Sequence, residues 1–313
     1  MWLFFASLTA FFEACKDATG KQSLKTLDEY SVLFSFMAVG VICMLPVLAI
    51  AGIPDIQSGF WLALFVGGGL NILAFTLYVR ALKIADLSLT VPLVTLTPLF
   101  LLVTSPILVQ EWPTHADALG VILLVIGSYV LNLPAKSFKS AGLSSSGLSS
   151  SGLRSSSLNS PDTHSIWTPL LAMARNPGSR LMLYVAFIWS ITSNFDKIGV
   201  LNSSPLLWAI ALFTVIAGGM VPFVFFRRGS RGLKPLLAQW QLLGVTGGFN
   251  AIAITFQMMA LTLAPVAQVI AVKRMSALLS VLFGHFFFKE KGLRERLLGA
   301  LIMVSGVVIM SLR

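Results

Sequence analysis

The sequence predicts an all-α membrane protein of ten transmembrane helices, built as two inverted five-helix repeats around a central cavity. Three observations support this fold class: long apolar blocks, a Ser/Gly-rich segment near the middle of the chain, and a match between the two halves. The 313 residues are 56% hydrophobic and only 11% charged, with a mean hydropathy of +0.87. A soluble domain of this length would carry far more charge on its surface.

The apolar residues form blocks of about twenty, which is the length that a helix needs to cross ~30 Å of hydrocarbon. Only helices and closed barrels satisfy their backbone polar groups in lipid, and these blocks lack the alternation of barrel strands. We therefore predict spans at 2–20, 30–51, 59–82, 86–109, 115–133, 181–200, 205–226, 236–261, 264–288 and 293–311.

A Ser/Gly-rich segment lies between the fifth and the sixth of these spans. From Gly142 to Leu158 a short Gly/Ser repeat contains too few apolar residues to bury a core. We expect a flexible, solvated linker at 135–165, which separates a first five-helix repeat at 1–134 from a second five-helix repeat at 166–313.

The two halves match each other when the sequence is shifted by 179 residues. The aligned pairs include Trp61 with Trp240, Gly68 with Gly247, Asn71 with Asn250, Thr76 with Thr255, Glu111 with Glu290, Gly120 with Gly299 and Gly127 with Gly306. Apolar matches between membrane segments arise by chance, whereas paired Trp, Asn, Glu and Gly in one register do not. Because each repeat has an odd number of spans, the two repeats must be inserted in opposite directions.

The net charge of +10 is explained by the loops rather than by a nucleic-acid partner. Most of the 22 Lys and Arg residues lie in or beside the loops that follow odd-numbered spans (1–2, 3–4, 5–6, 7–8 and 9–10). Because basic loops remain in the cytoplasm, we expect these loops to be cytoplasmic and both termini to lie outside. This placement predicts a multi-pass protein of a bacterial inner membrane, with the lipid bilayer and no nucleic acid as its surroundings.

The sequence lacks the patterns of enzymes, metal sites and cofactor sites. Cys15 and Cys43 lie in apolar surroundings, and His115, His164 and His285 have no ligand spacing. No nucleophile elbow, zinc motif or phosphate loop is present. We therefore expect no enzymatic activity, no metal and no cofactor, and we expect a gradient rather than ATP to drive any transport.

Each half ends with a similar series of motifs. In the first half these are Ala81-Leu82, Leu96-Thr97-Pro98, Glu111, Gly120 and Gly127; in the second half they are Ala260-Leu261, Glu290, Arg296, Gly299 and Gly306. With these motifs the chain resembles the drug/metabolite transporter superfamily, specifically its EamA-type ten-span members, over nearly its whole length outside the linker.

The resemblance implies a basket in which spans 1–4 and 6–9 surround a central cavity, with spans 5 and 10 outside it. Members of the superfamily move amino acids, sugars, nucleotide sugars, organic phosphates and other metabolites, and bacterial EamA-type members are often exporters. The better-known eukaryotic members have both termini in the cytosol, which is opposite to the orientation that the loop charges predict here.

The most informative residues within the spans are Lys273 and Arg274, about ten residues into the ninth span. A cation near the bilayer centre costs roughly 2.5–3.5 kcal/mol on insertion scales, so it lines a cavity or has a charged partner. One hypothesis makes this pair a cationic floor for a carboxylate or phosphate of the substrate. The alternative is a set of internal salt bridges to Glu13, Asp17 or Asp196.

The Lys-Arg pair also resembles the pair that plastid sugar-phosphate translocators have in the same span. In that family a further Lys in the fourth span helps to hold phosphate, and the matching position here is Val94. This difference argues against phosphate and leaves smaller carboxylates or amino acids as plausible substrates.

Charged residues also mark the first and the sixth span. Glu13, Lys16 and Asp17 share one face of the first span, and Asp196-Lys197 lies near the end of the sixth. The three carboxylates are candidates for proton coupling. The alternative is that these side chains reach from the ends of their spans toward the polar interface.

Polar residues repeat in the third and the eighth span. Asn71 and Tyr78 lie seven residues apart and match Asn250 and Gln257. Such stripes predict a cavity wall, with hydrogen bonds between helices as the alternative. The predicted substrate-binding residues are therefore Lys16, Asn71, Tyr78, Lys197, Asn250, Gln257, Lys273 and Arg274.

The leading functional hypothesis is a secondary carrier that alternates access to one central site and exports an anionic or zwitterionic metabolite, with a proton or another counter-ion as its coupling partner. The competing hypothesis is a membrane scaffold or sensor with a transporter-like fold. The carrier requires a hydrated cavity that reaches Lys273, whereas the scaffold requires a closed interior with paired cations. The sequence predicts no particular oligomeric state.

Overall fold

The computed structural model describes residues 1–24, 27–84, 93–132, 176–228, 236, 238–288 and 293–311. The secondary structure of these residues is helical, as the sequence predicted. The helices are α1 (Trp2–Ser23), α2 (Glu29–Ala51), α3 (Ser58–Ile84), α5 (Thr97–Leu108), α6 (His115–Asn132), α9 (Pro177–Leu201), α10 (Pro205–Arg228), α12 (Trp240–Leu263), α13 (Val266–Lys273), α14 (Ser276–Phe288) and α15 (Leu293–Ser311). The predicted linker at 135–165 lies outside the described residues.

Short polar caps fix where several helices begin and end. Asp28 caps α2 by accepting a hydrogen bond of 3.1 Å from the backbone nitrogen of Ser31, and Asn176 caps α9 at 2.9 Å from the nitrogen of Gly178. Both caps satisfy amide groups that the first turn of a helix leaves open. The end of α2 lies at Gly52, whose φ of 82° favours glycine.

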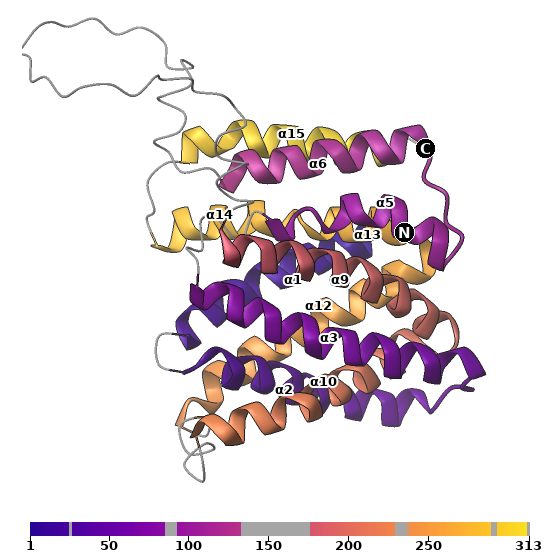
Figure 1. Cartoon of the computed structure of the whole chain (residues 1–313), viewed down its shortest axis with the longest axis vertical. Coiled ribbons are helices and arrows are strands. Elements are labelled where there is room, and N and C mark those ends of the chain that lie inside the picture. Colours follow the sequence, from indigo (N-terminus) through magenta and orange to yellow (C-terminus); the bar gives the residue numbers. More distant parts are fainter. Residues whose placement is uncertain are drawn as a thin grey trace, which may run out of the picture.

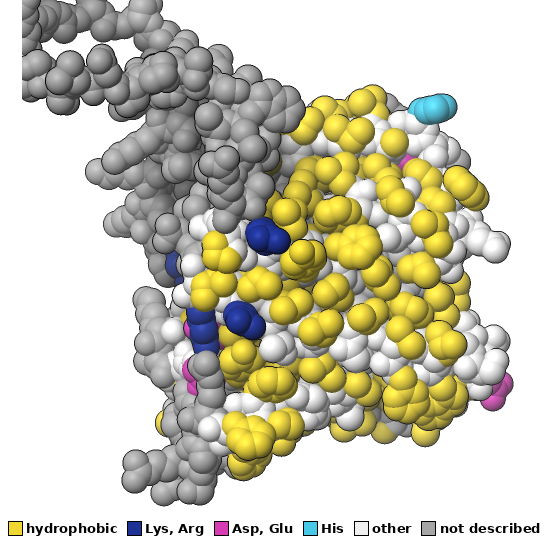
Figure 2. Space-filling model, viewed as in Figure 1, with side chains coloured by type: hydrophobic (Ala, Val, Ile, Leu, Met, Phe, Trp, Pro, Cys, Tyr) yellow, Lys and Arg dark blue, Asp and Glu magenta, His cyan; other side chains and the backbone are white. Residues whose placement is uncertain are grey.

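Within the described residues, five stretches are long and apolar enough to cross a membrane: α2, α3, Pro205–Phe226 of α10, α12 and Val266–Phe283. Shorter apolar helices occur at Thr97–Leu108, His115–Leu131 and Leu298–Ser311. Large hydrophobic side chains also cover the outer face of the helices in Figure 2, where the few basic side chains gather toward one edge. An apolar surface of this extent suits a lipid environment.

The helices lie side by side in a bundle, with both termini at the same end (Figure 1). The most extensive contacts join α6 to α15, α3 to α9, α1 to α12 and α2 to α10. Each of these pairs takes one helix from before the central linker and one from after it. The pair α6–α15 forms one edge of the bundle, and the pair α2–α10 forms the opposite edge (Figure 1).

Helices that occupy equivalent places in the two halves run antiparallel where they meet. On α6 and α15, Gly120 faces the backbone oxygen of Gly306 while Gly127 faces that of Gly299, so the facing order is reversed. A Cβ atom at Gly120 or Gly127 would approach that oxygen to 2.7 Å, because the glycines let the two backbones come into direct contact.

The pair α2–α10 shows the same reversal. The Tyr30 and Phe223 rings stack with centroids 5.6 Å apart, and Gly40, further along α2, packs against Phe213, which comes earlier on α10. The two helices therefore also run antiparallel.

The predicted ninth span at 264–288 contains a helix break in the structure. This segment consists of α13 and α14, which are separated by a turn at Arg274-Met275. The nitrogen of Arg274 donates to the oxygens of both Ile270 and Ala271, at 3.3 and 3.0 Å, and that of Met275 donates to Val272 at 2.9 Å. These tighter hydrogen bonds interrupt the α-helical pattern.

The predicted fourth span at 86–109 has a turn at the equivalent position. Residues 85–92 lie outside the described part, Leu93-Val94 is helical, and a turn at Thr95-Leu96 precedes α5. Proline at position 98 has no backbone N–H, and the Thr97 hydroxyl donates to the oxygen of Val94 at 2.7 Å. The shift of 179 residues places Thr95-Leu96 on Arg274-Met275, so both halves carry a break at the same point.

Candidate functional site

A cavity of about 780 Å³ lies between the two halves of the chain. Its described lining comes from α1, α2, α3, α9, α10, α12, α13 and α14 and from the start of α5 with the turn before it, and includes no residue of α6 or α15. The cavity extends from Arg274 to Leu24 and Glu29, where α1 ends and α2 begins. This arrangement brings together residues that are up to 270 positions apart in sequence.

Most of the predicted site residues line this cavity. They are Glu13, Lys16, Asp17, Asn71, Tyr78, Asp196, Asn250, Gln257, Lys273 and Arg274. The exception is Lys197, which follows Asp196 directly but forms a separate ion pair with Glu111, in the segment between α5 and α6. Neighbouring residues on a helix point about 100° apart, which explains why the two side chains diverge.

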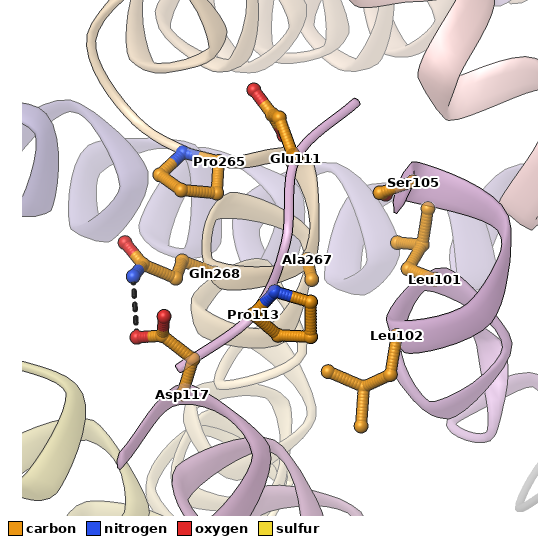
Figure 3. A pocket seen from close by; sticks show the side chains of 9 residues that line it. All are labelled: Leu101, Leu102, Ser105, Glu111, Pro113, Asp117, Pro265, Ala267 and Gln268. Carbon is orange, nitrogen blue, oxygen red and sulfur yellow. Dashed lines mark hydrogen bonds between the residues drawn. The ribbon is translucent and has the colours of Figure 1, made fainter. Parts of the chain in front are cut away.

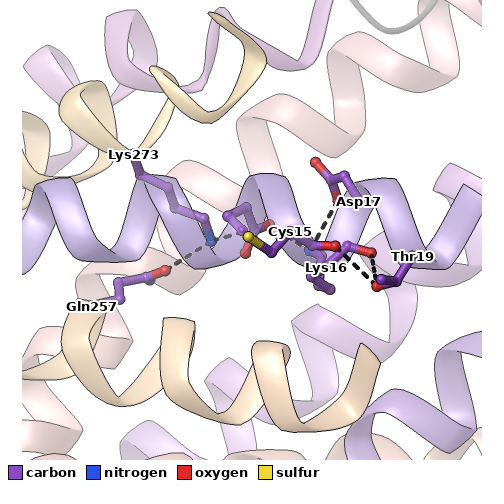
Figure 4. Close-up of polar contacts among 7 residues, drawn as sticks. Cys15, Lys16, Asp17, Thr19, Gln257 and Lys273 are labelled. Atoms are coloured by element: carbon purple, nitrogen blue, oxygen red, sulfur yellow. Dashed lines mark hydrogen bonds and ion pairs between the residues drawn. The ribbon is translucent and has the colours of Figure 1, made fainter. Parts of the chain in front are cut away.

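Four charged residues form a connected cluster on one side of the cavity. Lys16 Nζ lies 2.5 Å from Glu13 Oε1 and 3.4 Å from Asp17 Oδ1. Lys273 Nζ lies 3.9 Å from the same Glu13 oxygen and donates to Gln257 Oε1 at 2.8 Å. Figure 4 shows Lys273 reaching from its helix toward Gln257, with Lys16 close to Asp17. The lysines therefore both line the cavity and have carboxylate partners.

Arg274 differs from the two lysines. Its Nη2 donates to the hydroxyl of Thr97 at 3.1 Å, and its buried Nε has no hydrogen-bond partner. Among the residues that the structure describes, no carboxylate lies within 4 Å of the guanidinium. Because Arg274 and Thr97 stand at the two helix breaks, this hydrogen bond joins the breaks of the two halves.

Asp196 is a carboxylate in the cavity wall that, like Arg274, forms no ion pair within 4 Å among the described residues. Its side chain is only 7% exposed, and Oδ1 accepts a hydrogen bond of 3.1 Å from Trp208 Nε1 on α10. Within the described ranges no Lys or Arg lies within 4 Å of the carboxylate. Trp208 is fully buried and packs against Gly199, so the indole is held in place by its surroundings.

Asn71 and Asn250, which the 179-residue shift aligns, both line the cavity. Asn71 donates to the backbone oxygen of Gly67 one turn earlier, at 3.0 Å. Asn250 is 8% exposed, and its Nδ2 is buried without a hydrogen-bond partner. Among the described residues, the Nδ2 atom of Asn250 is therefore a buried donor without a hydrogen-bond acceptor.

An aromatic group forms another part of the wall. The Trp189 ring lies 5.7 Å from that of Phe75 and 5.5 Å from that of Tyr78, measured between ring centroids. All three rings therefore line the cavity and pack against one another.

A polar network joins three segments at the end of the bundle opposite to the α1–α2 connection. Glu111 pairs with Lys197, accepts a hydrogen bond of 2.8 Å from the nitrogen of Val266, and thereby caps α13. Lys197 Nζ donates to the oxygen of Ala264 at 2.9 Å. The network therefore ties the segment before α6 to α9 and to the loop before α13.

A second contact strengthens the same end. Gln268 Nε2 donates to Asp117 Oδ1 at 2.6 Å, beside a small recess that Glu111, Pro113 and Pro265 help to line (Figure 3). The sequence analysis missed this contact. Its signal was the spacing of Thr114 and Asp117, a reciprocal helix cap in which the Asp117 carboxylate accepts from the Thr114 nitrogen at 2.9 Å.

Comparison with known proteins agrees with this architecture. The model of the EamA-like transporter family matches residues 1–133 and 176–312, which are the two halves on either side of the linker. A solved structure described only as "Crystal structure of protein" has 16% sequence identity and a TM-score of 0.69, and the match covers 99% of this chain and 95% of that chain. No curated protein matches the sequence.

The solved structure shares the fold, and the family match covers most of the chain. Together with the apolar helices, the match makes the protein a multi-pass integral membrane protein. The resemblance to the drug/metabolite transporter superfamily is confirmed, and the chain belongs to the EamA-like transporter family.

Proposed function

We propose that the protein is a secondary active transporter that exports a small anionic or zwitterionic metabolite, such as an amino acid or an organic acid. The observation that carries this proposal is the cavity of about 780 Å³ between the two halves, lined by charged and amide side chains. The cavity reaches one end of the bundle, and the Glu111–Lys197 network closes the other end.

We further propose ten spans in two inverted repeats that rock about the cavity. The antiparallel course of α6 against α15 and of α2 against α10 supports the inversion, because these helices hold equivalent places in the two halves. The equivalent breaks before α5 and before α14 also support it. Inverted-repeat transporters place their sites between the repeats and often use discontinuous helices there.

A membrane scaffold or sensor with this fold is the competing function. It requires a closed interior in which each cation has an acidic partner. The size of the cavity and the lack of a carboxylate beside Arg274 among the described residues favour the transporter.

The loop charges support the proposed direction of transport. The cavity reaches the α1–α2 end, which the basic loops assign to the cytoplasm, so a substrate enters from the cytoplasm in this state. Glu13, Asp17 and Asp196 line the route and are the candidates for proton coupling.

The test is efflux from proteoliposomes loaded with a panel of amino acids and organic acids, with and without a proton gradient, followed by mass spectrometry. We expect efflux of at least one class, and we expect Lys273→Ala to reduce it about tenfold because a charged hydrogen bond is lost. Arg180→Ala, at the exposed start of α9, is the matched control and should leave efflux unchanged. If the wild-type protein moves no compound under either condition, the scaffold is the better assignment.

A further inference from the structure

We propose that the cavity wall formed by α3 and α9 holds a binding site for a monovalent alkali cation such as Na⁺, with the carboxylate of Asp196 as its charged ligand. The neutral ligands are the side-chain oxygens of Asn71, Thr192 and Ser193. This inference deepens the proposed function by naming a counter-ion, and only the step from binding to coupling rests on that function.

The packing of α3 against α9 fixes which residues face one another. A Cβ atom at Gly67 would lie 3.0 Å from the Cβ atom of Phe195, and the Phe75 ring lies 5.7 Å from the Trp189 ring, measured between centroids. The earlier position on α3 meets the later position on α9. The two helices therefore run antiparallel in close contact.

The four proposed ligands lie at one level of this contact. Asn71 is midway between the two contact positions on α3, and Thr192 is midway between those on α9, so the two face one another. Ser193 and Asp196 follow Thr192 by one and four residues. Side chains three or four residues apart on a helix are neighbours, with Cβ atoms about 5–6 Å apart. All four side chains line the cavity.

The three neutral groups offer acceptors to the cavity, because their donors are already engaged. Asn71 Nδ2 donates to the backbone oxygen of Gly67 at 3.0 Å. The hydroxyls of Thr192 and Ser193 donate to the backbone oxygen of Trp189 at 3.3 and 2.7 Å. Each side-chain hydrogen bond is therefore made within the residue's own helix, which leaves the oxygen lone pairs for a ligand.

Asp196 adds the negative charge. Its Oδ1 accepts from Trp208 Nε1 at 3.1 Å, which orients the carboxylate without bringing a positive charge. Within the described part of the chain, Asp196 Oδ2 and Asn71 Oδ1 accept no hydrogen bond, and neither atom is fully enclosed by protein. Burying a carboxylate without a cation is unfavourable. A site of oxygen acceptors with one unpaired carboxylate suits a hard cation.

The charge count favours a monovalent ion. Affinity for a divalent ion such as Ca²⁺ rises with the number of charged ligands, and this site has one carboxylate with three neutral oxygens. Lys273 acts on Asp196 electrostatically from beyond 4 Å, but its ammonium donates to Gln257 at 2.8 Å and lies 3.9 Å from Glu13. The positive charge of Lys273 is therefore shared with another carboxylate. Secondary transporters bind Na⁺ in such a place, between their two halves.

The experiment measures ion binding to the full chain in detergent. The melting temperature is followed as NaCl, KCl or methylammonium chloride replaces N-methyl-D-glucamine chloride at constant ionic strength, and in a separate titration with CaCl₂. The variants are Asp196→Asn and Ser193→Ala. Their matched controls are Asp55→Asn, at an exposed acid between α2 and α3, and Ser305→Ala, at an exposed hydroxyl that donates to its own helix at 2.8 Å.

We expect Na⁺ to raise the melting temperature of the wild-type protein by about 2–4 °C at saturating concentrations, because a ligand that binds the folded state stabilises it. Asp196→Asn should abolish the shift. Ser193→Ala should require about tenfold more Na⁺ for half of the shift, since one ligand is lost. Both controls should respond like the wild-type protein. If Asp196→Asn does not fold, the Ser193→Ala titration decides.

Four outcomes would overturn the site. These are no shift with Na⁺ or K⁺, an unchanged shift in Asp196→Asn, stabilisation by Ca²⁺ without an effect of alkali cations, and stabilisation by methylammonium alone, which would assign the wall to an organic ammonium group. The transport function is tested separately. A chain that binds Na⁺ in detergent but moves no compound from proteoliposomes keeps the site and refutes the transporter, whereas efflux that ignores a Na⁺ gradient refutes the coupling.

Discussion

The ion pair between Glu111 and Lys197 should hold one end of the bundle closed, and its strength can be worked out from the structure. The two side chains are 18% and 12% exposed, so both charges are largely removed from solvent. Removing one partner of a buried pair costs about 3–5 kcal/mol. Glu111→Gln keeps an acceptor for the nitrogen of Val266, so we expect a cost below this range, about 2–3 kcal/mol.

A free-energy change of this size raises the fraction of molecules open at that end by about 30- to 150-fold. The assay is thiol labelling of Ser105→Cys, a conservative change at a side chain that is 2% exposed in the recess beside Glu111. Cys15 and Cys43 are first replaced by Ala, and the protein is held in nanodiscs so that both faces meet the maleimide. We expect Glu111→Gln to raise the labelling rate at position 105 by the same factor.

Asp55→Asn is the matched control, because Asp55 is an exposed acid in the connection from α2 to α3 and should leave the rate unchanged. The double variant Glu111→Gln with Lys197→Gln should label more slowly than either single variant, since it leaves no buried charge without a partner. An unchanged rate in Glu111→Gln, or a double variant as fast as the faster single one, would refute the assignment of a closing role to this pair.

Two further predictions follow from close contacts. Gly127→Ala should lower the melting temperature by several degrees, because the added Cβ would lie 2.7 Å from a backbone oxygen of α15; Gly69→Ala, with no neighbour within 4 Å, is the control and should not lower it. Thr97→Val removes the hydroxyl that accepts a hydrogen bond from Arg274, and it should weaken substrate binding. We expect a KM about tenfold higher with little change in kcat. Thr262→Val is the control and should behave like the wild-type protein, because the Thr262 hydroxyl donates to its own exposed helix turn. Equal effects in a variant and its control would contradict either prediction.

Much of the fold follows from the sequence because burial in lipid leaves a strong signal. Long apolar blocks predicted the helices, and a register of matching Asn, Glu, Trp and Gly residues predicted the two halves that the family match covers. The break at Arg274-Met275 was missed because no proline or glycine marks it, and apolar blocks in a membrane carry no period that would reveal an interruption. Pro98 marks the helix break in the first half. The 179-residue shift between the halves could have been used to predict the equivalent break in the second half.

The site was predictable only in part. Charged and amide residues inside apolar segments pointed to the cavity wall, because such residues are costly in lipid. The sequence could not separate Lys273, which has a carboxylate partner, from Arg274, which contacts Thr97, since that difference depends on which helix each side chain faces. The location of Lys197 in the closed end was missed for the same reason.

The glycine contact between α6 and α15 has an evolutionary consequence. Gly120 faces Gly306 and Gly127 faces Gly299, so each position meets the duplicate of the other, as in a self-complementary homodimer. A subunit made of one half could form this contact with a second copy of itself, and each substitution there would alter the interface twice. Once both copies are joined in one polypeptide, each of the four glycines can be substituted independently. The α6 side and the α15 side of the contact can then diverge in sequence.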